Sequence, residues 1–148
     1  MKREKRVWIS LILVFILMMV LSGCSGVTGP KTAKLNISID PNPVPCSSED
    51  GKWNYTMTIS ESNGVGVTLT SVRFDSYDQA EQLYYTQFLY EEDIINWFKS
   101  NYIPAFSMLQ PGVQHSADTT KYTIITVEGI DDSSNPVEAT GRVDYLPQ

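Results

Sequence analysis

The sequence predicts an all-β fold, an antiparallel β-sandwich of immunoglobulin-like type with one short helix. From residue 35 onward, apolar and polar residues alternate with a period of two, the pattern of half-buried strands. Turn-forming residues separate the alternating runs. Roughly 115 residues are available for them, which is the size of a single sandwich domain.

The expected strands follow one another along the chain, at residues 35–39, 53–60, 65–74, 122–127 and 137–145. The third strand changes phase between Leu69 and Val72. Turn residues lie between the strands, at residues 49–51, 62–64 and 131–136. Within the second of these turns, Asn63-Gly64 suits a tight hairpin because both residues tolerate positive φ.

Residues 91–101 are predicted to form the helix. Acidic residues occupy positions 91–93, where the positive end of a helix stabilises them. Apolar residues then recur three and four positions apart, as on one face of a helix, and Pro104 ends the segment. We expect this helix to bridge two strands across the top or side of the sandwich.

Residues 1–23 form a different kind of segment. Four basic residues within positions 2–6 precede an apolar run from Val7 to Leu21 that only Ser10 interrupts. This order is typical of a secretory signal peptide. The run is about fifteen residues long, whereas a permanent bilayer span needs roughly 20. A signal peptide is therefore favoured over an uncleaved membrane anchor.

The end of the apolar run carries a motif. Leu21-Ser22-Gly23-Cys24 resembles the lipobox of bacterial lipoproteins, in which a Leu and two small residues precede an obligatory cysteine. The resemblance implies cleavage before Cys24, a diacylglycerol on its sulfur and acylation of the new amino terminus. Two or three acyl chains anchor a protein to a membrane stably. Ser25 implies the outer membrane if the cell has two membranes.

Residues 24–34 are expected to be a lipidated tether, because Gly, Ser, Thr and Pro replace the periodic pattern there. The ten residues from Ser25 to Lys34 span at most roughly 35 Å. The domain that follows, residues 35–148, is thus expected to lie close to an extracytoplasmic membrane surface.

That domain resembles the Ig-like modules of bacterial envelope proteins over residues 35–146. The resemblance rests on a proline-broken stretch at residues 40–45, a Trp53-x-Tyr55 strand and a Gly129-x-Asp131 turn in the last hairpin. The paired cysteines of antibody domains are missing from the sequence. The resemblance implies a sandwich fold and assigns no activity.

The charge balance bears on the partners of this domain. Residues 1–23 hold four of the eleven basic residues and one of the seventeen acidic ones. Seven basic and sixteen acidic residues therefore remain in residues 24–148, a net charge of −9. A domain this acidic repels phosphate backbones, so nucleic acid is not an expected partner.

The sequence offers little for catalysis, and we expect no enzyme activity and no cofactor. His115 is the single histidine, with Ser116 and Asp118 close by. Neighbours one and three apart on a loop rarely converge as a catalytic triad requires, so an exposed loop histidine is the favoured interpretation. A small hydrolase is the alternative, and it would need two carboxylates roughly 5–9 Å apart in a cleft.

Two further candidate sites have simpler explanations. Asp131, Asp132 and Asn135 place three oxygen donors in one loop, as a calcium site would, but these residue types also favour turns. Zinc is not expected. Cys46 has no partner once Cys24 is lipidated, and an inert thiol is favoured over a reactive or intermolecular one.

The most informative feature is a concentration of aromatic residues. Eight of the fourteen aromatic residues after Cys24 lie between residues 84 and 106. Either they form core with the helix closing one edge of the sandwich, or some face a partner. Adjacent Tyr84 and Tyr85 are expected on opposite faces of a strand. We predict that Tyr85, Tyr90 and Trp97 form an outward-facing patch that binds a partner.

Together these observations predict a membrane-anchored, non-catalytic lipoprotein of the cell envelope whose domain binds a protein or a glycan, or has a structural role. A protease inhibitor or adhesion module is the alternative among binding proteins. Its exposed loop would be Val44–Gly51, to which the preceding prolines give rigidity.

Overall fold

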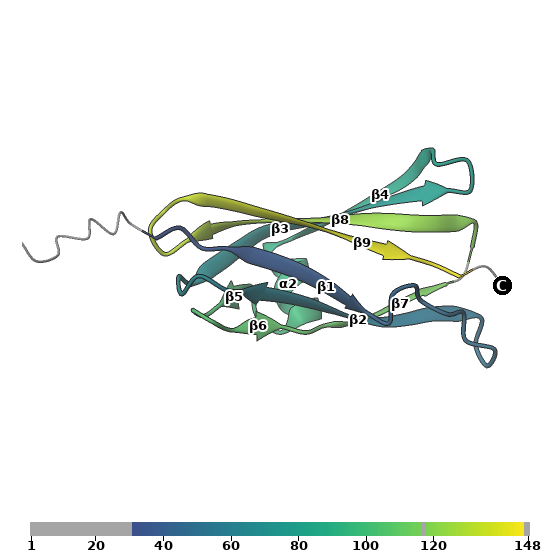
Figure 1. Cartoon of the computed structure of the whole chain (residues 1–148), viewed down its shortest axis with the longest axis horizontal. Coiled ribbons are helices and arrows are strands. Elements are labelled where there is room, and N and C mark those ends of the chain that lie inside the picture. Colours follow the sequence, from purple (N-terminus) through teal and green to yellow (C-terminus); the bar gives the residue numbers. More distant parts are fainter. Residues whose placement is uncertain (1–30, 117, 147–148) are drawn as a thin grey trace, which may run out of the picture.

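A computed structural model of the chain describes residues 31–116 and 118–146. Two antiparallel sheets pack face to face as an Ig-like β-sandwich, which confirms the predicted fold class (Figure 1). The described elements are β1 (Leu35–Asp40), β2 (Lys52–Glu61), β3 (Val67–Asp78), β4 (Leu83–Tyr90), α2 (Glu91–Phe98), β5 (Tyr102–Ile103), β6 (Met108–Leu109), β7 (Gly112–Ser116), β8 (Thr120–Asp131) and β9 (Pro136–Asp144).

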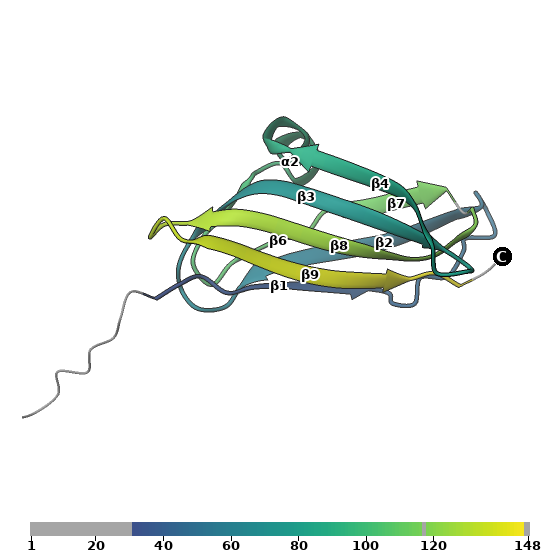
Figure 2. The ribbon, with the colours of Figure 1, turned by 90° about the horizontal axis from the view of Figure 1, so that it is seen from above.

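In the first sheet, β2 is central, with β1 on one side and the short strands β6 and β7 on the other. The second sheet has the order β4-β3-β8-β9, and β5 also pairs with β3. The edge strands β1 and β9 run side by side along one edge of the sandwich, and α2 lies at the other edge (Figure 2). At the β1–β9 edge the side chain of Ile37 packs directly against the backbone of Gly141, since a Cβ on Gly141 would lie 2.6 Å from Cγ2 of Ile37.

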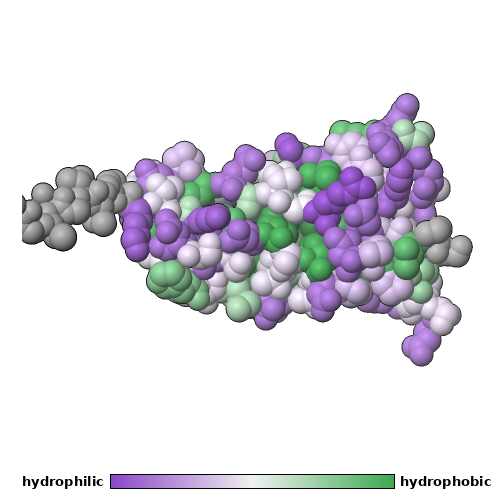
Figure 3. All heavy atoms as spheres, in the orientation of Figure 1, coloured by the Kyte–Doolittle hydropathy of each residue, from purple (hydrophilic) through white to green (hydrophobic). Residues whose placement is uncertain are grey.

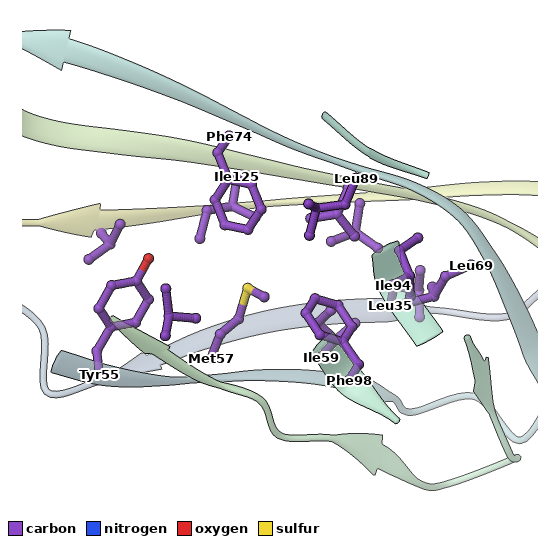
Figure 4. Close-up of a cluster of buried hydrophobic side chains, with 14 of the residues drawn as sticks. Leu35, Tyr55, Met57, Ile59, Leu69, Phe74, Leu89, Ile94, Phe98 and Ile125 are labelled. Carbon is purple, nitrogen blue, oxygen red and sulfur yellow. The ribbon is translucent and has the colours of Figure 1, made fainter. Parts of the chain in front are cut away.

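The core lies between the sheets and follows the predicted alternation. Trp53, Tyr55, Met57 and Ile59 on β2 are all buried. From the side of α2, Ile94 and Phe98 also point into the core (Figure 4). The predicted phase change in β3 is a register shift between Leu69 and Ser71. The last hairpin, β8–β9, also forms as the Asp- and Asn-rich turn predicts.

The helix is shorter than predicted. It ends at Phe98, because Lys99 adopts a left-handed conformation with φ 65°. The Lys99 ammonium group donates a hydrogen bond of 2.8 Å to the carbonyl of Asn96. The chain then enters β5 before Pro104, so the proline does not end the helix.

The turn at residues 62–64 is not the predicted tight hairpin. The strands on either side of it, β2 and β3, belong to different sheets. The turn therefore connects the two layers. Gly64 does adopt positive φ, at 83°, as the hairpin argument required.

A buried carboxylate organises this connection. Glu61 is only 3% exposed, and its Oε1 accepts backbone N–H bonds from Asn63 (2.7 Å) and Lys34 (3.1 Å). Its Oε2 accepts bonds from Gly64 (2.8 Å) and Phe106 (3.0 Å). Burial by itself raises the pKa of Glu61, but the four hydrogen bonds together lower it to about 2. The carboxylate is therefore ionised at neutral pH.

The predicted signal peptide (residues 1–23), the lipidation site Cys24 and the tether up to residue 30 lie outside the described residues. Within the part of the chain that the structure describes, no helix is long and apolar enough to cross a membrane.

Candidate binding cleft

A cleft of about 60 Å³ lies between edge strand β4 of one sheet and edge strand β7 of the other. It is on the same edge of the sandwich as α2, away from the seam between β1 and β9. The side chains at its sides come from three elements: Tyr85 and Gln87 of β4, Trp97 of α2, and Gln114 and His115 of β7.

The structure brings together two of the three residues of the predicted patch. Tyr85 is 52% exposed and Trp97 45% exposed, and both line the cleft. Tyr90 is 62% exposed but stacks on Phe88, with ring centroids 6.1 Å apart. Tyr85 and Tyr90 are five positions apart in β4, and an odd separation in a strand places side chains on opposite faces. Tyr90 therefore lies outside the cleft.

Most of the aromatic segment is not core. Of its eight aromatic residues only Phe98 is buried. The alternative that this segment packs in the core is therefore wrong for the other seven residues. Four of these seven residues lie in β4, which is an edge strand with a neighbour on one side only. The helix α2 does cover one edge of the sandwich, through Ile94 and Phe98.

Neither of the adjacent residues Tyr84 and Tyr85, which were expected on opposite faces of a strand, is buried. The register of β3 and β4 shifts after Ser76, so that Tyr84 is an extra residue in the pairing. The Tyr84 hydroxyl donates to Asp118 at 3.1 Å, and its own exposed fraction is 44%. A bulge of this kind interrupts the strict alternation on which the prediction rested.

The prediction that His115 lies on an exposed loop is wrong, because the residue lies in strand β7. It pairs with Trp53 of β2 and is half-buried. Its ring centroid lies 5.7 Å from that of Trp53 and 6.0 Å from that of Tyr145. The sequence Gln114-His115-Ser116 has no apolar alternation, and nothing local in it indicates a strand.

Asp118 faces this histidine, with 3.7 Å between its Oδ2 and the His115 Nε2. Burial raises the pKa of Asp118, but hydrogen bonds from Thr120 and Tyr84 outweigh it and lower the pKa. Ser116 follows His115 in strand β7, so the two side chains lie on opposite faces of the sheet. The buried Ser76 hydroxyl in the cleft is paired with Thr123 at 3.0 Å. The histidine and the aspartate thus meet without an adjacent serine nucleophile.

The inner wall of the cleft carries neutral hydroxyl groups. Tyr55 and Tyr145 are buried there, and the Tyr145 hydroxyl lies 3.4 Å from Oγ1 of Thr123. Burial raises the pKa of both tyrosines above the ordinary value. The cleft therefore offers a bound group aromatic faces, amides, an imidazole and uncharged hydroxyls.

The candidate calcium loop uses its carboxylates internally. Asp131 Oδ1 accepts backbone bonds from Ser133 (2.9 Å) and Asn135 (2.8 Å), and Oδ2 accepts one from Ala33 (3.1 Å). Asp132 accepts a bond of 3.1 Å from the Tyr102 hydroxyl. Over residues 31–116 and 118–146, no group of three or more His, Cys, Asp or Glu side chains could hold a metal ion.

The loop Val44–Gly51, proposed as the inhibitory loop of a protease inhibitor, is partly fixed to the domain. Val44 is fully buried and forms a bridge with Tyr145, and the half-buried Cys46 forms a bridge with Trp53. Residues 48–51 form its exposed tip. Cys46 is a free thiol whose sulfur lies 3.7 Å from the carbonyl of Ser47.

No protein-family model matches this chain, and no curated protein matches it. Solved structures do. The crystal structure of the CARDB domain of a Pyrococcus furiosus protein, in complex with di-metal ions, is 15% identical, covers 82% of this chain and 100% of that chain, and has a TM-score of 0.44. The solution structure of that domain is 13% identical, with coverages of 80% and 99% and a TM-score of 0.41.

A Bordetella pertussis protein that carries the name ApaA is 12% identical, with coverages of 80% and 98% and a TM-score of 0.45. At such identities and TM-scores the similarity concerns the fold alone.

Proposed function

We propose that this protein is a membrane-anchored, non-catalytic lipoprotein of the cell envelope, and that its domain binds a protein or glycan partner in the cleft. One observation carries the proposal: Tyr85 and Trp97, from different elements, are both about half exposed and line the same cleft. Exposed aromatic rings are enriched where proteins meet partners, and their faces stack on sugars and on planar groups.

Polar groups in the cleft support binding of a partly polar group. The side-chain amides of Gln87 and Gln114 line the cleft and reach solvent. A ligand hydroxyl or carbonyl group can form hydrogen bonds with such amides. A lipid anchor at Cys24 would hold the cleft close to other envelope components, and that raises the effective concentration of a weakly bound partner.

A hydrolase is the alternative from a different class. Glu128 and Glu138 are direct neighbours across β8 and β9, and both are exposed beside a hollow on the second sheet. The Glu128 carboxylate accepts a hydrogen bond of 2.7 Å from Ser71. The two-sided aromatic cleft favours a binding module over this open surface.

The binding proposal is tested by photo-crosslinking in intact cells. Benzoylphenylalanine in place of Tyr85 is expected to give adducts with an envelope component, whereas the same group in place of Tyr90 is not. Tyr85→Ala combined with Trp97→Ala is expected to weaken partner binding at least about tenfold, because aromatic hot spots each contribute 1–2 kcal/mol or more. Tyr90→Ala, on the other face of β4, is the matched control. Equal amounts of adduct at positions 85 and 90 would contradict binding of the partner in the cleft.

The anchoring proposal predicts that Cys24→Ser abolishes fatty-acid incorporation and moves the protein out of the detergent-soluble membrane fraction. The reason is that the thiol is the only group at this position that can form the thioether. Metabolic labelling with an alkyne fatty acid measures the effect. Cys46→Ser removes the other cysteine and is expected to leave the label unchanged. A Cys24→Ser protein that still carries the label would disprove lipidation at this residue.

A further inference from the structure

The tether and an exposed aromatic residue are fixed to the same carboxylate. The two oxygens of Glu61 accept the backbone N–H of Lys34, where the predicted tether ends, and that of Phe106. Phe106 is therefore held beside the point at which the chain enters the domain. In Figure 1 this is the end of the sandwich where β1 begins and where β5 and β6 lie.

Phe106 is presented in a defined position. It lies in a turn closed by a 3.1 Å bond from the Ser107 N–H to the Pro104 carbonyl, and it has φ 56°. Its ring lies so close to Gly64 that a Cβ there would be 2.5 Å from it. The opposite side of the ring is open, since Phe106 is 72% exposed, the most exposed large apolar residue of the described part.

Other apolar residues near the strand ends at this end are exposed too. They are Tyr102 at 40%, Met108 at 52% and Ile130 at 43%. Figure 3 shows green, apolar atoms on the surface near β5 and β6. Together with Phe106 we call these residues the tether-end cluster.

The charges at this end suit a membrane surface. The carboxylates of Glu61 and Asp131 are buried and bonded to backbone N–H groups, whereas Asp132 in the β8–β9 turn is exposed and accepts the hydrogen bond of the Tyr102 hydroxyl. Lys31 and Lys34 are exposed. Aromatic side chains and lysines are the residue types that settle at the boundary between lipid headgroups and acyl chains.

We propose that the tether-end cluster, with Phe106 at its centre, inserts into the interfacial region of the bilayer that holds the Cys24 lipid. This inference rests on the proposed lipidation. The tether, at most roughly 35 Å when extended, keeps this end near the lipid. The contact directs the cleft outward, because Tyr85 and His115 lie toward the opposite end of their sheets. A partner can then reach the cleft without obstruction by the membrane.

The test uses the full-length lipidated protein in vesicles of phosphatidylcholine and phosphatidylglycerol that contain brominated phosphatidylcholine. For each variant we measure the tryptophan quenching in excess of that of the wild-type protein. This excess is expected to be about threefold greater for Phe106→Trp than for Tyr85→Trp, because only an interfacial side chain lies roughly 5–10 Å deep among the headgroups and acyl chains. Both variants share the background from Trp53 and Trp97. Met108→Trp provides a second position in the tether-end cluster.

Mass spectrometry of the same samples establishes whether the acyl chains are present. Lipidated protein in which neither Phe106→Trp nor Met108→Trp is quenched more than Tyr85→Trp overturns the membrane contact and leaves the proposed lipoprotein function standing. Protein that carries no lipid overturns both. Stronger quenching at positions 106 and 108 in lipidated protein supports the orientation.

Discussion

Glu61→Gln is expected to lower the free energy of unfolding by about 3 kcal/mol at neutral pH, because a buried ionised acceptor is replaced by a neutral amide. Four backbone N–H groups converge on the two carboxylate oxygens. Glutamine offers them one acceptor oxygen, and its NH₂ group faces donors. Urea unfolding followed by tryptophan fluorescence measures the loss.

The pH dependence identifies the charge as the cause. The pKa of Glu61 is lowered from 4.5 to about 2 in the folded protein, so the carboxylate stabilises the fold fully above pH 4.5. This stabilisation is lost as the pH falls from 4.5 to about 2. The difference between the wild type and Glu61→Gln should therefore shrink over that interval. Glu138→Gln, at an exposed site, is the control and should change stability by less than about 0.5 kcal/mol. A pH-independent difference would contradict this explanation.

Trp53→Ala is expected to cost about 4 kcal/mol of stability, the middle of the range for deletion of a buried tryptophan. Trp53 is 1% exposed, stacks on Tyr145 at 4.4 Å between ring centroids and donates from its indole nitrogen to the carbonyl of Leu146. Since His115 packs against the same ring, the change should also disturb the cleft wall.

Trp53→Phe separates packing from hydrogen bonding. It keeps an aromatic ring but loses the indole donor, so it should cost about 1–2 kcal/mol, at most half of the cost of alanine. Chemical unfolding gives both values, and the chemical shifts of the His115 ring report on the cleft. Equal losses for Phe and Ala would mean that the hydrogen bond, and not the buried ring, dominates at this position.

The strands that could be predicted are those with one buried and one exposed face. In β1, β2 and β9 the apolar residues recur at every second position, and β8 is rich in β-branched residues, so both patterns are visible locally. Strand β4 has both faces largely exposed, and β5, β6 and β7 are short or polar, so no alternation indicates them. Strand β7 forms because β2 offers it a partner.

Some residues of the candidate site could be predicted from the sequence, but the way in which they come together could not. The aromatic concentration indicated Tyr85 and Trp97, but neither their convergence with His115 nor the separation of Tyr90 from them. One missed signal lies in the sequence of β2, where Glu61 continues the buried phase of Tyr55, Met57 and Ile59. A charged residue in that phase indicates a carboxylate with buried partners.

By itself, the sequence determined the phase of the main strands, the presence of the helix and the acidic character of the domain, because these depend on neighbouring residues. It also carries the lipobox, whose lipidation stays a prediction. Only the tertiary structure decided that β2 and β3 belong to different sheets, that β7 places His115 against Trp53, and that Glu61 joins the tether to Phe106. Such contacts join residues far apart in the chain, and local periodicity carries no information about which distant segments pair.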